Sequence, residues 1–191
     1  MSNLKKIELE QLIAGYSKGF FPMAHPEMNN EIFWHLPEKR GIIPLNDFII
    51  PKNVRRLYEK REFVLKVNAN FEMVIRECAR RKETWISEEI INAYSRLHEK
   101  GLAHSFEAYQ NNELVGGLYG VAMKKVFFGE SMFFKVSNAS KVTLVYLVEF
   151  LIKNGYKLLD TQYLNPHLKQ FGAIEINNED FQKLLFDALS D

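Results

Sequence analysis

The sequence predicts an α+β fold, in which helices pack in an α/β arrangement around a mixed sheet. It also predicts one main domain and a small N-terminal domain. Residues 104–134 contain three segments of strand character separated by turn residues. A long helix that opens at residues 137–140 and ends at Asn154 is apolar on almost every side, which indicates a buried helix. It leads into a short apolar strand at residues 156–162. The pattern therefore predicts a β-α-β unit in which the two strands are parallel and the connection between them is right-handed.

Size and composition limit the possible functions. The chain has 191 residues, a hydrophobic content of 47% and a formal net charge of +1. Near-neutral charge argues against generic electrostatic capture of nucleic acid, although a local basic patch is compatible with it. Cys78 is the single cysteine, which excludes an intramolecular disulfide and a cysteine-based metal site. Without a signal peptide or an apolar run of ~18 residues, we expect a cytoplasmic protein that does not enter the membrane.

The first 37 residues are expected to form the small domain, and residues 38–191 the main one. Residues 8–18 have helical periodicity, residues 20–26 resemble a loop rich in aromatics and proline, and the charged run 38–41 is the best boundary. Such a short head cannot bury much apolar surface alone, so it should pack on the rest. Its aromatic residues are explained by that docking, and a ligand wall is the alternative.

Two basic clusters follow. Between residues 52 and 66 there are six basic and two acidic side chains, a local charge of +4. A helix with Asn70 as its expected N-cap ends in the basic run 80–82, where positive charge favours the helix dipole. A solvated face is the alternative explanation for both clusters. Trp85, just before a helix capped by Ser87, can act as a hydrophobic staple or as a stacking platform for a base.

The most informative residues lie on the two strands of the β-α-β unit. Asp160 and Gln162 are two apart, so both side chains should project from one face at the strand end, before the turn signal Asn165-Pro166. Glu130 is a lone acid in an apolar run, and a buried charge needs a cationic partner or a cavity. The pattern predicts a pocket for an apolar and a cationic group; the alternative is that Glu130 pairs with a lysine. The parallel strands should bring the three residues together at the carboxyl end of the sheet.

Several short motifs occur in a fixed order along nearly the whole chain. They are Ala14-Gly15-Tyr16, Gly19-Phe20-Phe21-Pro22, Thr84-Trp85-Ile86, Arg96-Leu97-His98-Glu99, Gly101-Leu102-Ala103-His104-Ser105, Leu114-Val115-Gly116-Gly117-Leu118-Tyr119-Gly120, Phe128-Gly129-Glu130-Ser131-Met132-Phe133, Asn138-Ala139-Ser140-Lys141, Asp160-Thr161-Gln162, His167-Leu168 and Phe171-Gly172-Ala173. In these motifs the chain resembles the bacterial leucyl/phenylalanyl-tRNA–protein transferases.

The resemblance implies a GNAT-like acyltransferase fold with a small N-terminal domain. It implies an enzyme that moves leucine, phenylalanine or methionine from aminoacyl-tRNA to the α-amino group of proteins that begin with arginine or lysine, which are then degraded. No cofactor or metal is implied, and we expect a monomer. The five histidines show no metal-ligand spacing on one element.

The same resemblance assigns roles to residues of this sequence. Asp160 and Gln162 would be the catalytic pair, and Glu130 would recognise the basic acceptor. The aminoacyl side-chain pocket would be lined by Leu118, Phe127, Met132, Leu147 and Leu159. The terminal adenosine would be surrounded by Tyr16, Met23 and Trp85, with Asn165 also binding substrate, and tRNA phosphates would be contacted by Lys52, Arg55 and Arg56. Met23 stands where better-known members carry tryptophan.

The chemistry is consistent with these residue types. An aminoacyl ester is already activated, and an N-terminal amine with a pKa of about 8 is partly neutral at neutral pH. Gln162 can accept a hydrogen bond from the amine while Asp160 polarises or orients the amide. An acetyl-CoA-dependent N-acetyltransferase would need a Gly-rich loop at residues 136–141, which contain no glycine. A non-catalytic RNA-binding module would leave Glu130 unexplained.

Overall fold

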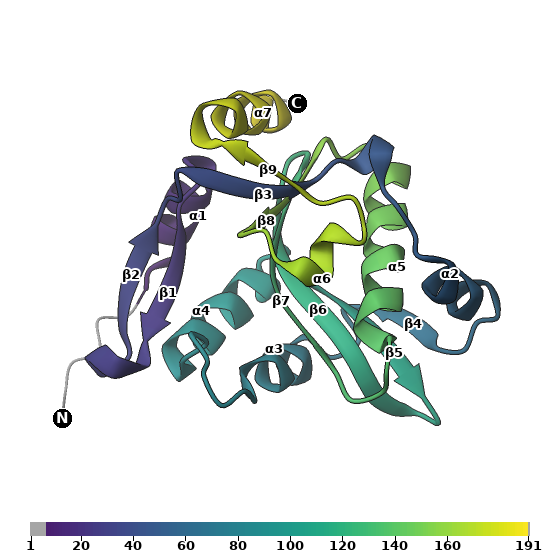
Figure 1. Cartoon of the computed structure of the whole chain (residues 1–191). Coiled ribbons are helices and arrows are strands. Elements are labelled where there is room, and N and C mark those ends of the chain that lie inside the picture. The colour runs from purple at the N-terminus through teal and green to yellow at the C-terminus, as the bar shows by residue number, and fades with distance from the viewer. Residues whose placement is uncertain (1–6, 191) are drawn as a thin grey trace.

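A computed structural model describes residues 7–190 and is built around a seven-stranded sheet (Figure 1). Its strand order is β4-β5-β6-β7-β8-β3-β9. The strands are β3 (Lys39–Ile43), β4 (Val64–Val67), β5 (Ala103–Gln110), β6 (Glu113–Met123), β7 (Val126–Phe134), β8 (Leu158–Gln162) and β9 (Ile174–Asn177). A separate hairpin consists of β1 (Phe21–His25) and β2 (Glu31–His35). The α-helices are α1 (Leu9–Ser17), α2 (Lys52–Glu59), α3 (Phe71–Ala79), α4 (Glu88–Glu99), α5 (Ala139–Lys153), α6 (Pro166–Lys169) and α7 (Asn178–Ser190).

Helices cover both faces of the sheet. On one face, α5 packs on β5, β6 and β7; on the other, α3 and α4 pack with α1 and the hairpin (Figure 1). The sequence prediction of a buried helix is confirmed for α5, in which nine residues are buried, although Ile152 is half exposed. The predicted caps are also present, since the side chains of Asn70 and Ser87 accept from Met73 N and Ile90 N. Within residues 7–190 none of the helices is both long and apolar enough to cross a membrane.

The predicted parallel pairing of β7 with β8 is confirmed, and it is short. The register runs from Val126 opposite Leu158 to Phe128 opposite Asp160, after which the two strands separate. All other strand pairs of the sheet are antiparallel. A sheet that opens between two parallel strands leaves a gap that side chains from both faces can reach.

Each strand beside this gap carries one extra residue. In β7 the partners of Tyr119 and Gly120 are Ser131 and Gly129, so Glu130 has no residue opposite it. In β8 the partners of Gly41 and Ile42 are Gln162 and Asp160, so Thr161 is likewise unpaired. Such β-bulges bend a strand and re-aim its side chains, and they are frequent beside active sites.

Three sequence expectations need correction. Residues 20–26 were expected as a loop, yet Phe21–His25 form β1; Pro22 is tolerated there because the hairpin has only two strands and both are edges. Strands β3, β4 and β9 were not predicted, because β3 lies in the charged run that suggested a boundary, and β4 and β9 are short strands in which at least half of the residues are exposed. Arg40, in that charged run, is completely buried.

Candidate active site

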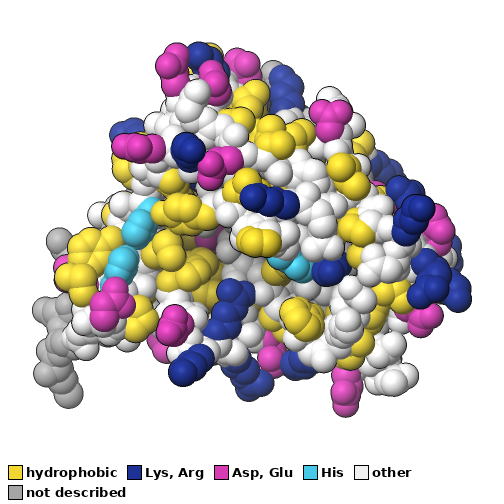
Figure 2. Space-filling view, in the orientation of Figure 1, with side chains coloured by type: hydrophobic (Ala, Val, Ile, Leu, Met, Phe, Trp, Pro, Cys, Tyr) yellow, Lys and Arg dark blue, Asp and Glu magenta, His cyan; other side chains and the backbone are white. Residues whose placement is uncertain are grey.

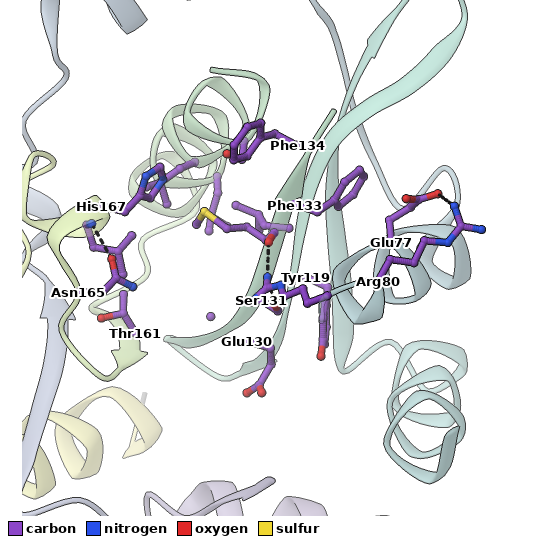
Figure 3. A pocket seen from close by; sticks show the side chains of 18 of the residues that line it. Glu77, Arg80, Tyr119, Glu130, Ser131, Phe133, Phe134, Thr161, Asn165 and His167 are labelled. Atoms are coloured by element: carbon purple, nitrogen blue, oxygen red, sulfur yellow. Dashed lines mark hydrogen bonds and ion pairs between the residues drawn. The ribbon is translucent and has the colours of Figure 1, made fainter. Parts of the chain in front are cut away.

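A cavity of about 740 Å³ occupies the gap between β7 and β8 (Figure 3). Its apolar wall comes mainly from the α5 face and consists of Leu118, Met132, Leu144, Leu147 and Leu159. Figure 3 shows Thr161, Asn165 and His167 along one side and Glu77 with Arg80 along the other, with Glu130 and Tyr119 between them. The cavity therefore has a lipophilic part, one partly buried acid, Glu130, and a charged rim.

Glu130 is held by neutral hydrogen-bond donors. Tyr16 OH donates to its Oε1 at 2.6 Å, Tyr94 OH to its Oε2 at 3.3 Å, and Gln162 Nε2 to Oε1 at 2.9 Å. The hydroxyls of Tyr16 and Tyr94 also contact each other. Among residues 7–190, no cationic side chain forms an ion pair with Glu130, so the alternative of a lysine partner is not found in the described part of the chain.

The pKa of Glu130 reflects this environment. Burial raises it from 4.5 to about 7, against the lowering effect of the hydrogen bonds from Tyr16 and Gln162. Burial also raises the pKa of Tyr16 and Tyr94, which keeps both hydroxyls protonated as donors at neutral pH. A carboxylate in such a site is stabilised when a cation enters the cavity, because the cation offsets the cost of burying the charge.

Gln162 has an unusual backbone conformation. Its φ of 62° places it in the left-handed region, which few residues other than glycine adopt. Its main-chain N–H donates to Asp160 Oδ1 at 2.8 Å, which helps to hold this conformation. The amide nitrogen of Gln162 faces Glu130 Oε1, so the amide oxygen is left for another partner.

Asp160 does not touch the side-chain amide of Gln162, which corrects the expectation that it polarises this group. Instead, Asp160 Oδ1 and Oδ2 accept from Arg40 Nε at 2.8 Å and Nη2 at 2.6 Å, and both side chains are completely buried. Arg40 Nη1 also donates to the carbonyl oxygen of Gly19 at 2.8 Å. Asp160 thus orients Gln162 through the main chain.

Comparison with known proteins adds to this geometry. The family model for leucyl/phenylalanyl-tRNA protein transferase matches residues 42–186, and the model for the N-terminal domain of that family matches residues 6–38. The chain is 46% identical over 192 residues to the leucyl/phenylalanyl-tRNA–protein transferase of Paramagnetospirillum magneticum, covering 98% of this chain and 92% of that protein. It is 47% identical to that of Chlorobaculum parvum, covering 96% of each. The chain belongs to the leucyl/phenylalanyl-tRNA–protein transferase family.

It is accordingly an aminoacyltransferase, with an aminoacyl-tRNA and a protein as its substrates. The crystal structure of FemX is similar in fold, with a TM-score of 0.57, 13% identity, and coverage of 92% of this chain and 70% of that chain. The architecture is the mixed-sheet, GNAT-like fold that the sequence resemblance implied.

The other residues that the resemblance suggested for this family are not all at the cavity. Those that line it are Leu118, Met132, Leu147, Leu159, Trp85 and Asn165. Phe127 is buried below the wall, against Phe106, and does not line it. Met23 lies on β1 outside the lining, although the N–H of its neighbour Ala24 donates to Trp85 O at 3.1 Å.

The three basic residues of α2 lie elsewhere. Lys52, Arg55 and Arg56 are exposed, none of them lines the cavity, and α2 packs against α5 (Figure 1). Asn165 has a local role as well, since its Oδ1 accepts from Leu168 N at 3.0 Å and caps α6.

Sequence reasoning missed Arg40 and Tyr94. A buried Asp160 needs a cationic partner, and this need was a usable signal. The sequence does not show which cation it is, because Arg40 lies 120 residues away. Tyr94 occupies an ordinary apolar position of a helix, and nothing in its local pattern indicates that its hydroxyl reaches Glu130.

Replacing Glu130 by glutamine should change how stability depends on pH. Since the folded pKa lies above the ordinary value, the native state binds more protons than the unfolded chain between about pH 4.5 and 7. Ionisation of Glu130 therefore lowers the free energy of unfolding as pH rises through this window. The whole of this destabilisation is present above pH 7. As pH rises from 4 to 8, we expect the free energy of unfolding of Glu130→Gln to increase by up to about 3 kcal/mol relative to that of the wild type.

Urea denaturation of both proteins at several pH values measures this difference, in which all other titrating groups cancel. A difference that stays constant across the range would contradict the raised pKa of Glu130.

Proposed function

We propose that this enzyme transfers leucine, phenylalanine or methionine from aminoacyl-tRNA to the α-amino group of proteins that begin with arginine or lysine, and that the product is marked for degradation. The observation that carries the acceptor assignment is Glu130, a partly buried carboxylate that lines the cavity and, among the described residues, is bound by neutral donors alone. Positive charge on the first residue of the acceptor would complete this site. Neutral or acidic first residues would leave the carboxylate unpaired, or repel it.

The donor side chain would occupy the apolar wall made by Leu118, Met132, Leu147 and Leu159. Burying a leucine or phenylalanine side chain there is favourable by ~1.5–3 kcal/mol, whereas a charged side chain would lose its hydration without gaining a partner. Trp85, on the cavity rim, would stack on the terminal adenosine, with Met23 and Tyr16 nearby. Phe127 would act from behind, by supporting the wall.

The reaction needs one proton to move. The nitrogen lone pair of the acceptor amine attacks the ester carbonyl carbon, a C–N bond forms, and the C–O bond to the ribose breaks. The amine loses a proton, and the ribose oxygen leaves with one. Because the ester is already activated, correct placement of amine and carbonyl supplies most of the acceleration.

Gln162 is the residue that would place the amine. Its amide nitrogen is held by Glu130, so its Oε1 can accept from the incoming amine N–H. Asp160 would act as a positioning residue, since it fixes the main chain of Gln162 and is itself fixed by Arg40. Lys52, Arg55 and Arg56 would bind phosphates of the tRNA body, which makes binding sensitive to salt.

A donor competition tests the function directly. The purified protein is incubated with Phe-tRNA and acetyl-CoA together with a peptide that begins with arginine, and the loss of each donor is followed. We expect Phe-tRNA to be consumed and acetyl-CoA to be left, with Gln162→Ala lowering kcat by about 10²-fold because amine placement is lost. Matched peptides that begin with alanine or glutamate are the controls. Consumption of acetyl-CoA, or equal transfer to all three peptides, would refute the proposal.

Leu147→Trp should change the choice of donor. The larger side chain fills the apolar wall, so the bulkier phenylalanine should be lost first. We expect kcat/KM for Phe-tRNA to fall about tenfold more than for Leu-tRNA. The control is Phe150→Trp, on the same helix but more exposed and outside the cavity lining. Equal losses for both donors would argue against Leu147 as part of the wall.

A further inference from the structure

A basic run at the end of α3 has no role in the function described so far. Arg80 and Arg81 follow the last residue of this helix, and both line the rim of the cavity with Lys135 of the chain after β7. Figure 2 shows a group of Lys and Arg side chains beside a hollow on the lower part of the face drawn there. Favourable interaction with the helix dipole accounts for basic residues at this position, but not for their placement around the opening of a cavity.

Arg81 is the best placed of these cations. Its Nη2 donates to Ser131 Oγ at 2.8 Å and to the carbonyl oxygen of Met132, so the guanidinium is fixed against β7 by two neutral oxygens. Among the described residues it forms no ion pair with a carboxylate. A guanidinium has five N–H donors, so those on Nε and Nη1 remain for a planar or tetrahedral anion.

Arg80 and Lys135 flank it and share one acid. Arg80 Nη1 and Lys135 Nζ contact the same oxygen of Glu77 at 2.9 and 3.0 Å. One carboxylate thus offsets one of the two flanking charges, and the rim stays positive by about two charges. The rim also contains Trp85, for which an adenine partner is proposed above.

We propose that Arg81, flanked by Arg80 and Lys135, binds the phosphates that join the last nucleotides of the aminoacyl-tRNA donor. The inference rests on the proposed function. With the aminoacyl side chain at the apolar wall and the adenine at Trp85, the next phosphates of the chain leave the cavity through its opening, where these cations lie. This site is separate from α2, which would contact the tRNA body.

Three phenylalanyl donors of increasing length separate the two sites. The first is phenylalanyl-adenosine, which has no phosphate; the second is the phenylalanyl ester of cytidylyl-cytidylyl-adenosine, which has two phosphodiesters; the third is Phe-tRNA. We expect Arg81→Gln to raise KM about tenfold for the second and third donors and by less than twofold for the first. In Arg81→Gln, the slope of log KM against log salt concentration for the second donor should decrease by about one.

The matched control is Arg56→Gln on α2, for which we expect a loss with Phe-tRNA alone. Arg81→Lys, which keeps the charge but not the fork, should fall between wild type and Arg81→Gln. An equal loss with all three donors would overturn the inference, because Arg81 would then only shape the wall at Ser131 and Met132. An unchanged KM for the trinucleotide donor would overturn it as well. Failure of the wild type with every donor would instead refute the proposed function.

Discussion

The site depends on one buried ion pair, between Arg40 and Asp160. Both oxygens of Asp160 are occupied by Arg40, and one of them also accepts the main-chain N–H of Gln162. The guanidinium lies over the rings of Phe21 and Phe181 at 4.8 and 4.5 Å from their centroids. Removing one partner of a fully buried pair costs ~3–5 kcal/mol because the other charge is left without compensation.

This pair also joins segments that are distant in the sequence. Phe21 belongs to the N-terminal hairpin, Arg40 to β3, Asp160 to β8 and Phe181 to α7. The carbonyl oxygen of Gly19 accepts a further hydrogen bond from this guanidinium. The N-terminal segment is therefore part of the support of the active site, since without it Arg40 would lose a ring and an acceptor.

The order of dependence then runs from the core to the cavity. Arg40 fixes Asp160, Asp160 fixes the left-handed main chain of Gln162, and the amide of Gln162 meets Glu130. The bulges at Glu130 and Thr161 lie on either side of the gap where the parallel pairing ends. Both Glu130 and Thr161 line the cavity, and a sheet with perfect alternation would not aim both of these neighbouring bulged residues into the gap.

Sequence patterns predicted the local parts of this arrangement and not its long-range parts. The β-α-β unit and the caps at Asn70 and Ser87 follow from periodicity and residue type, which are local properties. The strand β3, with Arg40, resembled a linker because its charge is compensated only by a residue 120 positions later. The bulges could not be predicted, because they are defined by the partner strand.

The most direct test of this account is a double-mutant cycle on kcat with saturating Phe-tRNA and an arginine-starting peptide. Arg40→Lys, Gln162→Ala and the double variant are compared, after circular dichroism has verified that each is folded. If Arg40 acts through the placement of Gln162, Arg40→Lys should lower kcat about tenfold when Gln162 is present and by less than twofold when it is alanine. The same fold-loss in both backgrounds would contradict the account.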